Sequence, residues 1–278
     1  MEITEKQLRQ FAAHLRSGER SPGTLEKYLR DVRAFAVWLD GRELTGGTAA
    51  KWREHLVKTG YAPVTVNSML SAVNSFFKFL GREDCRIKFL RVQRRTFREQ
   101  DRELTKAEYQ RLLATAQGCG QERLGLLMET ICSTGIRVSE VRYITLEAAR
   151  WGRADISLKG KIRTILLPSK LCRKLLKYAK KQKIASGEIF LTRSGKSLSR
   201  RQIWRDMKAL CKKAGVEESK VFPHNLRHLF AVSFYKACKD IVKLADILGH
   251  SSINTTRIYL VTTGAEHARQ LEKLGLVT

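Results

Sequence analysis

The stretch Pro223-His224-Asn225-Leu226-Arg227-His228 organises this chain, together with Leu248-Gly249-His250-Ser251 and Ile258-Tyr259 further on. It gathers basic and polar side chains shortly before one tyrosine. Arginine and histidine side chains at helix ends suit a bound phosphate, and a tyrosine beside them is a candidate nucleophile. The question for the rest of the chain is whether it delivers a phosphate to this cluster and completes the site.

The charge of the chain points to a polyanionic partner. Among 278 residues, Lys and Arg number 53 against 27 Asp and Glu, which gives a formal net charge of +26 and a pI of about 10.2. Basic residues occur in nearly every segment, so we expect much of the surface to face nucleic acid. The length suits two domains, and 43% hydrophobic residues are ordinary for a globular protein.

The six cysteines are scattered, with no C-x-x-C pair and no Cys/His cluster at metal-ligand spacing. We therefore expect no metal site and a reducing compartment. No apolar run approaches the roughly 18 residues of a membrane span, and the N-terminus lacks the apolar core of a signal peptide. These features predict no membrane partner and a cytoplasmic or, in a eukaryote, nuclear location.

Residues 1–90 are predicted to form an all-helical domain. Thr4, Ser21, Thr48 and Pro63 each precede or open an apolar pattern with helical spacing. The aromatic stripes favour a core over base-stacking platforms. Three cations of the second helix lie off its apolar stripe and are candidates for DNA contact: Lys27, Arg30 and Arg33.

Residues 91–103 lose this periodicity and read as a basic linker between domains. A linker with this charge would follow a DNA backbone and let two domains close around a duplex. A merely solvated spacer is the alternative. The candidate DNA-binding residues of the linker are Arg91, Arg94, Arg95 and Arg98.

Residues 104–278 form the second predicted domain. Thr105 and Glu108 make a capping box, and an apolar helix over 124–134 ends at Gly135. Arg137 then starts a new helix in apolar surroundings, where a buried arginine needs an anionic partner. Glu140 follows one turn later and can orient its guanidinium while leaving donors free for a phosphate.

A hairpin is predicted over 154–168, with Lys159-Gly160-Lys161 at its tip. Helices over 169–183 and 199–214 follow, separated by a short strand at 189–191. The tail 260–278 contains a short helix whose apolar face either packs on its own domain or docks on a neighbour. The fold class is thus mainly α with a small antiparallel β-sheet: a helical N-terminal domain followed by a mixed α/β domain.

The chemistry of these residues suits attack on a phosphodiester. Arg137 and Arg227 come from separate helix starts, so a fold can bring them to one phosphate, where a planar guanidinium binds two oxygens. His224 shares a helix face with Arg227, and His250 can donate to a remaining oxygen. Tyrosine is a poor nucleophile at neutral pH without a base and positive surroundings. A lysine at the hairpin tip is a reasonable proton donor to the departing oxygen.

In this order and spacing the residues resemble the tyrosine recombinases, or phage integrase family. The motifs are Thr134-Gly135-Ile136-Arg137-Val138-Ser139-Glu140, Lys159-Gly160-Lys161, His224-Asn225-Leu226-Arg227-His228, Leu248-Gly249-His250-Ser251-Ser252 and Tyr259. They lie throughout the second domain. The N-terminal bundle looks like the core-binding domain of the simple, two-domain Xer-type members.

The resemblance implies an enzyme for DNA integration, excision or resolution. Tyr259 would attack the scissile phosphate and leave a 3′-phosphotyrosine and a 5′-hydroxyl, without ATP or a metal. Arg137, Arg227 and His250 would contact the phosphate, and His224 matches the general base, with Glu140 steadying the site and His228 as structural support. Four protomers would join two double-stranded DNAs, exchange strands through a Holliday junction and donate C-terminal tails to one another.

The hairpin departs from the family's Gly-Lys-Gly-x-Lys pattern and is one residue shorter. Alignment on the glycine favours Lys159 as the general acid and leaves Lys161 as the alternative. If Lys159 is the general acid, Lys161 is a candidate for DNA contact. Two rival functions have to be weighed. A type IB topoisomerase is disfavoured by the short chain and the N-terminal bundle, and a DNA-binding protein without catalysis is disfavoured by the full set of candidate residues.

Overall fold

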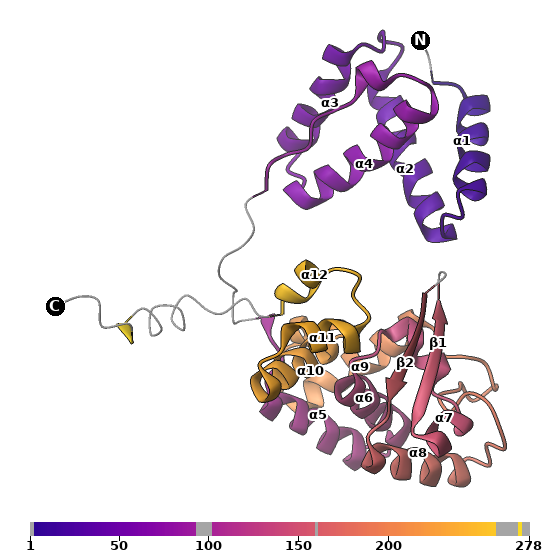
Figure 1. Ribbon diagram of the computed structural model, residues 1–278, viewed down its shortest axis with the longest axis vertical. Helices are drawn as coiled ribbons and strands as arrows, with labels where there is room; N and C mark the ends of the chain where they lie inside the picture. Colours follow the sequence, from indigo (N-terminus) through magenta and orange to yellow (C-terminus); the bar gives the residue numbers. More distant parts are fainter. Residues whose placement is uncertain (1–2, 93–101, 159–160, 260–271, 274–278) are drawn as a thin grey trace. The chain divides into compact units, whose positions relative to one another are not determined.

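The structure, a computed structural model, describes residues 3–92, 102–158, 161–259 and 272–273. The chain divides into two compact units, Met1–Arg94 and Arg95–Thr278 (Figure 1). Both are built mainly of helices, and the second contains a small antiparallel sheet. The fold class predicted from the sequence is confirmed. Most of the predicted linker and nearly all of the predicted tail lie outside the described residues.

The first unit is a helical bundle around an aromatic core. Its elements are α1 (Glu5–Ser17), α2 (Pro22–Leu39), α3 (Gly46–Lys58), α4 (Pro63–Phe79) and the 3-10 turn η1 (Glu83–Cys85). Thr4 starts α1 with a capping box, and Ser21 caps α2. Phe11, Phe35 and Phe76 are fully buried, and Phe11 meets Phe76 edge to face. The aromatic stripes therefore belong to the core, as the sequence predicts.

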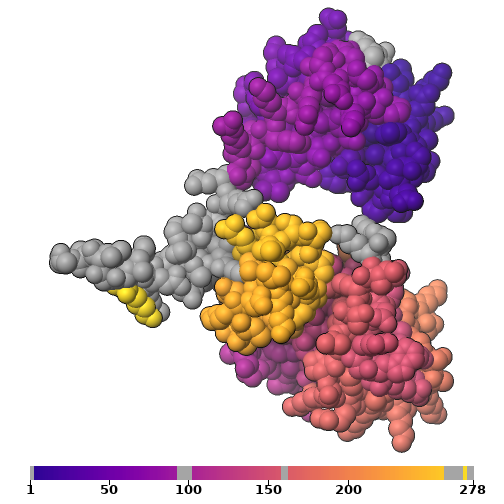
Figure 2. All heavy atoms as spheres, in the orientation of Figure 1, coloured from indigo at the N-terminus to yellow at the C-terminus, as the bar shows by residue number. Residues whose placement is uncertain are grey.

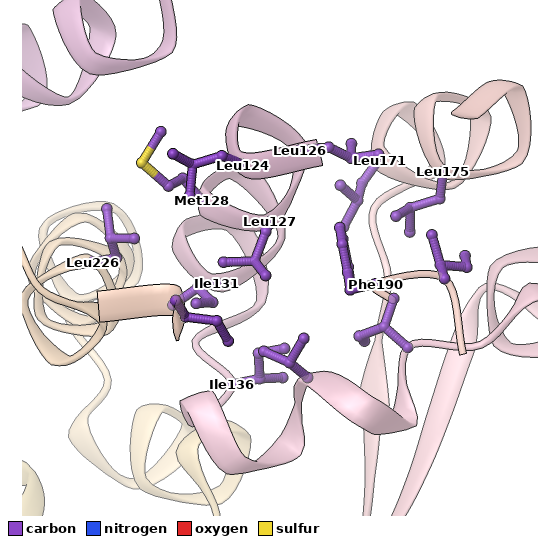
Figure 3. Close-up of a cluster of buried hydrophobic side chains, with 14 of the residues drawn as sticks. Leu124, Leu126, Leu127, Met128, Ile131, Ile136, Leu171, Leu175, Phe190 and Leu226 are labelled. Atoms are coloured by element: carbon purple, nitrogen blue, oxygen red, sulfur yellow. The ribbon is translucent and has the colours of Figure 1, made fainter. Parts of the chain in front are cut away.

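The second unit surrounds one buried helix, α6 (Glu122–Thr134). The helix packs against α5 (Lys106–Gly118), α8 (Ser169–Lys181), α9 (Arg200–Ala214) and α10 (Pro223–Cys238). Figure 3 shows its apolar side chains between those of α8 and α10, with the labelled residues Leu124, Leu126, Leu127, Met128, Ile131, Ile136, Leu171, Leu175, Phe190 and Leu226. Most of the buried side chains of α6 are apolar, as a helix packed on several neighbours requires.

The remaining elements of this unit are short. They are η3 (Val138–Tyr143), α7 (Leu146–Trp151), β1 (Arg153–Leu158), β2 (Lys161–Leu166), η4 (Glu218–Lys220), α11 (Ile241–Leu248) and α12 (Ile253–Arg257). The strands pair antiparallel from Arg153↔Leu166 to Leu158↔Lys161. The predicted hairpin is confirmed, and its tip, Lys159-Gly160, lies outside the described residues.

Three sequence predictions about local structure are wrong. The third helix does not start at Thr48, because Thr45 is its N-cap and Gly46 its first residue. The segment 189–191 is not a strand, because its backbone makes only the bridges Thr145↔Glu188 and Leu191↔Ser197 around two buried side chains. Arg137 does not begin an α-helix. It caps the 3-10 turn η3, because the Glu140 side chain accepts from its backbone N–H and tightens the turn.

The fold brings α11, which packs on α10 and α12, beside the hairpin. Figure 2 shows the yellow surface of α11 and α12 next to the pink surface of the hairpin, and Arg163 of β2 donates to the carbonyl of Ile247 in α11. The candidate residues on these elements can therefore meet those of η3 at one place.

Candidate active site

Arg227 is the buried centre of the site. Its side chain leaves the second turn of α10 and is 2% exposed. It donates to the carbonyls of Gly135 and of Leu248, the latter at 2.8 Å. These carbonyls end α6 and α11, where backbone oxygens have no helical partner and carry partial negative charge. Burial, and next the charge of Arg137, lower the pKa of Arg227 to about 10, so it stays protonated at neutral pH.

Gly135 makes this arrangement possible. It ends α6 with φ +66°, and a Cβ there would lie 2.5 Å from Cδ1 of Phe230. Only glycine combines this left-handed backbone with so close an approach by α10. The carbonyl of Gly135 thereby reaches Arg227.

Arg137 and Glu140 form a second part of the site. The Glu140 carboxylate accepts from the Arg137 backbone at 2.7 Å and from its guanidinium at 3.0 Å. Burial raises the pKa of Glu140, but the hydrogen bonds from Arg137, together with the charge and the hydrogen bond of Arg163, outweigh it and hold the pKa below its usual value. The Arg137 side chain is 41% exposed, so its guanidinium is orientated by Glu140 and remains reachable for a ligand.

Gly249 links the two arginines through neighbouring carbonyls. Arg137 donates to Gly249 O at 3.5 Å, and Arg227 donates to the adjacent Leu248 O. The two guanidinium groups, ninety residues apart in sequence, are therefore held by consecutive peptide groups.

His250 follows this turn and is neutral. Its Nε2 lies 2.9 Å from Arg227 Nη2 and its Nδ1 lies 2.9 Å from Thr256 Oγ1. A guanidinium has no acceptor, so Nε2 must accept and Nδ1 carries the proton. Burial, followed by the charges of Arg227, Arg137 and Arg163, lowers the pKa of His250 to about 4. Donation from Nε2 to a phosphate therefore requires that the imidazole gain a proton or change tautomer.

Tyr259 lies among the three histidines. It is 4% exposed and packs with Leu244 and Leu248. Its ring centroid is 6.0 Å from His224, 5.3 Å from His228 and 5.9 Å from His250. Its hydroxyl also interacts with the guanidinium of Arg227, which raises the pKa of that arginine against the effect of burial. His224 is exposed and His228 is buried, which fits a role at the rim for the first and support for the second.

Two residues of the site were not predicted from the sequence: Thr256, which holds His250, and Arg163. Arg163 donates to Glu140 at 2.5 Å and to Ile247 O at 2.8 Å. The sequence gives no clear signal for it, because the inward-facing position of Arg163, opposite buried Ile156 and between exposed Ile162 and Thr164, is known only from the structure. A charge at a core-facing position of a strand demands a partner.

The other candidates are described only in part. Lys159 and the side chain of Lys161 lie outside the described residues, so the choice of general acid stays a prediction. Arg94, Arg95 and Arg98 lie outside them too, whereas Arg91 is exposed.

The three cations of α2 have acidic partners in the first unit. Lys27 and Arg30 both pair with buried Asp31, at 2.6 Å and 3.0 Å. Arg33 lies 3.5 Å from Glu5. One carboxylate neutralises one of the two charges beside Asp31, so a positive charge remains there.

The described residues contain no group of three or more His, Cys, Asp or Glu side chains placed to hold a metal ion. Nor do they include a helix long and apolar enough to cross a membrane.

Comparison with known proteins gives matches along the whole chain. The model of the phage integrase family matches residues 102–265, and that of the phage integrase N-terminal SAM-like domain matches residues 8–84. The tyrosine recombinase XerA of Thermococcus kodakarensis is 30% identical over 275 residues, with 96% of this chain and 94% of the relative covered. XerD of Halalkalibacterium halodurans is 28% identical, with 95% of each chain covered.

Solved structures share the fold at lower identity. A crystal structure of XerA recombinase aligns with a TM-score of 0.54 at 23% identity, over 99% of this chain and 100% of the other. XerH bound to its difH substrate in a pre-cleavage complex aligns with a TM-score of 0.69 at 18% identity, over 96% and 84%. A lambda integrase dimer bound to a core site aligns with a TM-score of 0.71 at 18% identity, over 92% and 94%.

Proposed function

Because the chain belongs to the phage integrase family and is a tyrosine recombinase, we propose that Tyr259 is the nucleophile with which it cleaves DNA. The enzyme acts in site-specific recombination by cleaving and rejoining DNA strands. One observation carries the assignment of the nucleophile. Tyr259 is the tyrosine whose ring packs against His224, His228 and His250 and whose hydroxyl meets buried Arg227.

The phosphate binds between Arg137 and Arg227 in this proposal. No carboxylate pairs with Arg227 among the described residues, whereas Glu140 pairs with Arg137. The site therefore has an excess of positive charge that an anion would offset. Charge that develops on the phosphate oxygens in the transition state is stabilised by donors already in place.

The reaction conserves the bond energy of the phosphodiester, because each step replaces one phosphoester bond with another. The Tyr259 oxygen attacks phosphorus, its proton passes to His224, and the bond from phosphorus to the 5′ oxygen breaks. The 5′ oxygen takes a proton from Lys159, with Lys161 as the alternative. The products are a 3′-phosphotyrosine and a 5′-hydroxyl. A 5′-hydroxyl of the partner duplex then attacks the 3′-phosphotyrosine and gives up its proton to the lysine, the bond from phosphorus to Tyr259 breaks, and Tyr259 regains its proton from His224. This exchange gives the Holliday junction, so neither ATP nor a metal is consumed.

A trapped adduct tests this proposal. We expect the wild-type protein to form a denaturation-resistant covalent complex with a duplex nicked near the cleavage point, because the short 5′ fragment diffuses away and cannot rejoin. The duplex should carry a sequence that the protein selects from a random pool, and the complex is measured on a denaturing gel. Tyr259→Phe should form none while still binding DNA. If the wild-type protein forms no adduct on any selected site, Tyr259 is not the nucleophile.

Arg137→Ala provides the companion experiment. Removing one preorganised donor costs about 10²–10³-fold in rate for comparable sites, so cleavage should fall by that factor. DNA binding, measured by mobility shift, should change little, since one phosphate contact among many is lost. A variant that cleaves at the wild-type rate would remove Arg137 from the site.

We further propose a homotetramer on two synapsed DNA sites, with the tail from Leu260 exchanged between protomers and the cytoplasm as the place of reaction. The solved lambda integrase dimer on a core site supports assembly on DNA for that protein. Chemical crosslinking on paired duplexes should trap four protomers. Deletion from Leu260 onward should abolish this species and leave binding of single protomers intact.

A further inference from the structure

Arg163 of β2 is a largely buried arginine with no role in the reaction outlined above. Its side chain is 15% exposed, against 41% for that of Arg137. It faces inward with Ile165, while the neighbouring Ile162 and Thr164 are exposed. A guanidinium in this position is directed at the protein and not at a DNA backbone passing over the surface.

The guanidinium of Arg163 joins three elements. One nitrogen donates to Glu140 Oε2 in η3 at 2.5 Å, and another donates to Ile247 O in α11 at 2.8 Å. The other Glu140 oxygen holds the guanidinium of Arg137. Ile247 lies three residues before His250 in the same turn. Arg163 thus contacts the supports of two residues that would bind the phosphate.

Gly249 packs directly on the Arg163 side chain. A Cβ on Gly249 would lie 2.5 Å from Cδ and 2.9 Å from Nη1 of Arg163, and the backbone there has φ +62°. The turn before His250 therefore needs glycine for its conformation and for the passage of this arginine. The close fit fixes the distance between β2 and the turn.

The stability of the fold alone does not account for an arginine here. Its Nε is buried without a hydrogen-bond partner among the described residues, which carries a desolvation cost. Buried ion pairs contribute little net stability compared with well-packed apolar side chains. An apolar residue would fill the position without the unpaired nitrogen, but it could not bind Glu140 and Ile247 O together.

We propose that Arg163 is a positioning residue of the active site, which holds Glu140 and the Ile247–Gly249 turn and thereby sets Arg137 and His250 against the phosphate. The proposal rests on the recombinase chemistry above. Arg163 does not itself touch the reacting atoms. Its loss should impair transition-state stabilisation at the phosphate and leave DNA affinity nearly unchanged.

Single-turnover cleavage of the nicked duplex, at saturating protein, tests this. We expect Arg163→Met to cleave about 100-fold more slowly than wild type, the scale of loss seen when a group is displaced by about 1 Å. Arg163→Lys should recover part of the rate, since its ammonium reaches Glu140 but cannot bridge to Ile247 O as well. DNA affinity should stay within about threefold, as positioning groups do not set uniform binding.

Arg153→Met is the matched control. Arg153 lies on the same hairpin but on its outer face, opposite Leu166, and is exposed. Its replacement should leave cleavage unchanged. Thermal unfolding of each variant shows whether it is folded at the assay temperature, and Arg163→Lys carries the test if Arg163→Met is not.

Two further measurements separate positioning from other roles. In a double-mutant cycle with Glu140→Gln, the combined loss should be smaller than the product of the single losses, because Arg163 acts through Glu140. On a duplex with sulfur in place of the 5′ bridging oxygen, whose thiolate leaves without a proton, Arg163→Met should remain slow.

The proposal is overturned if Arg163→Met cleaves at the wild-type rate, if the losses simply multiply, or if the sulfur substrate restores the rate. The last result would place Arg163 with the proton donor of the hairpin. Failure of the wild-type protein to form an adduct would instead reject the reaction itself, so the two failures are distinguishable.

Discussion

At the scale of single residues, the charge state of His250 depends on what occupies the site. In the free protein its Nε2 accepts from Arg227, and the burial of the ring and three nearby arginines favour the neutral form. A phosphate bound by Arg137 and Arg227 would offset those charges. It would also compete for the guanidinium that now faces Nε2. Ligand binding and protonation of His250 are therefore coupled.

We expect the pKa of His250 to rise from about 4 in the free protein towards or above its ordinary value in the DNA complex. NMR of ring-labelled histidine in Tyr259→Phe measures both states without cleavage, and His250→Gln identifies the resonance. An identical pKa in the two states would show that no anion binds beside His250.

The same shift affects stability, with a definite sign. Because the folded pKa lies below 6.5, the unfolded chain binds the proton first as pH falls. The contribution of His250 to the free energy of unfolding therefore decreases from pH 6.5 to about pH 4 and is constant above and below this window.

At the scale of elements, α6 and α10 meet where Gly135 ends α6. A methyl group there has to be accommodated against the Phe230 ring and Leu248 Cδ2, at 2.5 Å and 3.0 Å. The same glycine has φ +66°. Packing and backbone conformation therefore both require it.

Gly135→Ala should destabilise the second unit by about 3 kcal/mol, the sum of a left-handed backbone and overpacking. Differential scanning calorimetry should show its transition about 6–12 °C lower. Gly152→Ala is the matched control, since Gly152 ends α7 with φ +71° and a Cβ there would have open space around it. It should lose only about 1 kcal/mol, from the backbone alone. Equal losses in the two variants would contradict the packing argument.

The elements show what a sequence discloses and what it does not. Capping at Thr105 and the glycine stop at Gly135 are local, so both helix ends were predictable. Arg137 was identifiable as a phosphate-binding candidate, but its 3-10 turn depends on one hydrogen bond from its backbone N–H to the Glu140 carboxylate. The role of Arg163 depends on its hydrogen bond to the carbonyl of Ile247, 84 residues away. Thr256 belongs to the site only because its hydroxyl contacts His250. Contacts between distant segments carry no periodic signal.

At the scale of the whole molecule, a formal charge of +26 makes DNA binding an ion-exchange process. Each phosphate contact releases counterions, so the logarithm of the affinity falls linearly with the logarithm of salt, with a slope of about −0.9 for each contact. The charges that touch phosphate can therefore be counted by variants.

Arg30→Gln should reduce the magnitude of that slope by about one. Lys27 and Arg30 share the single carboxylate of Asp31, and the Arg30 side chain is 73% exposed, so one positive charge beside Asp31 is available to a phosphate. Affinity is measured by fluorescence anisotropy from 50 to 200 mM salt, over which wild type should weaken by about 10³-fold or more.

The control is Arg153→Gln, which removes an exposed arginine of the hairpin and tests for the effect of losing net charge alone. If Arg30→Gln and Arg153→Gln give the same slope as wild type, α2 does not contact the backbone through Arg30. If both reduce the slope equally, the effect belongs to the overall field of the molecule and not to a local contact.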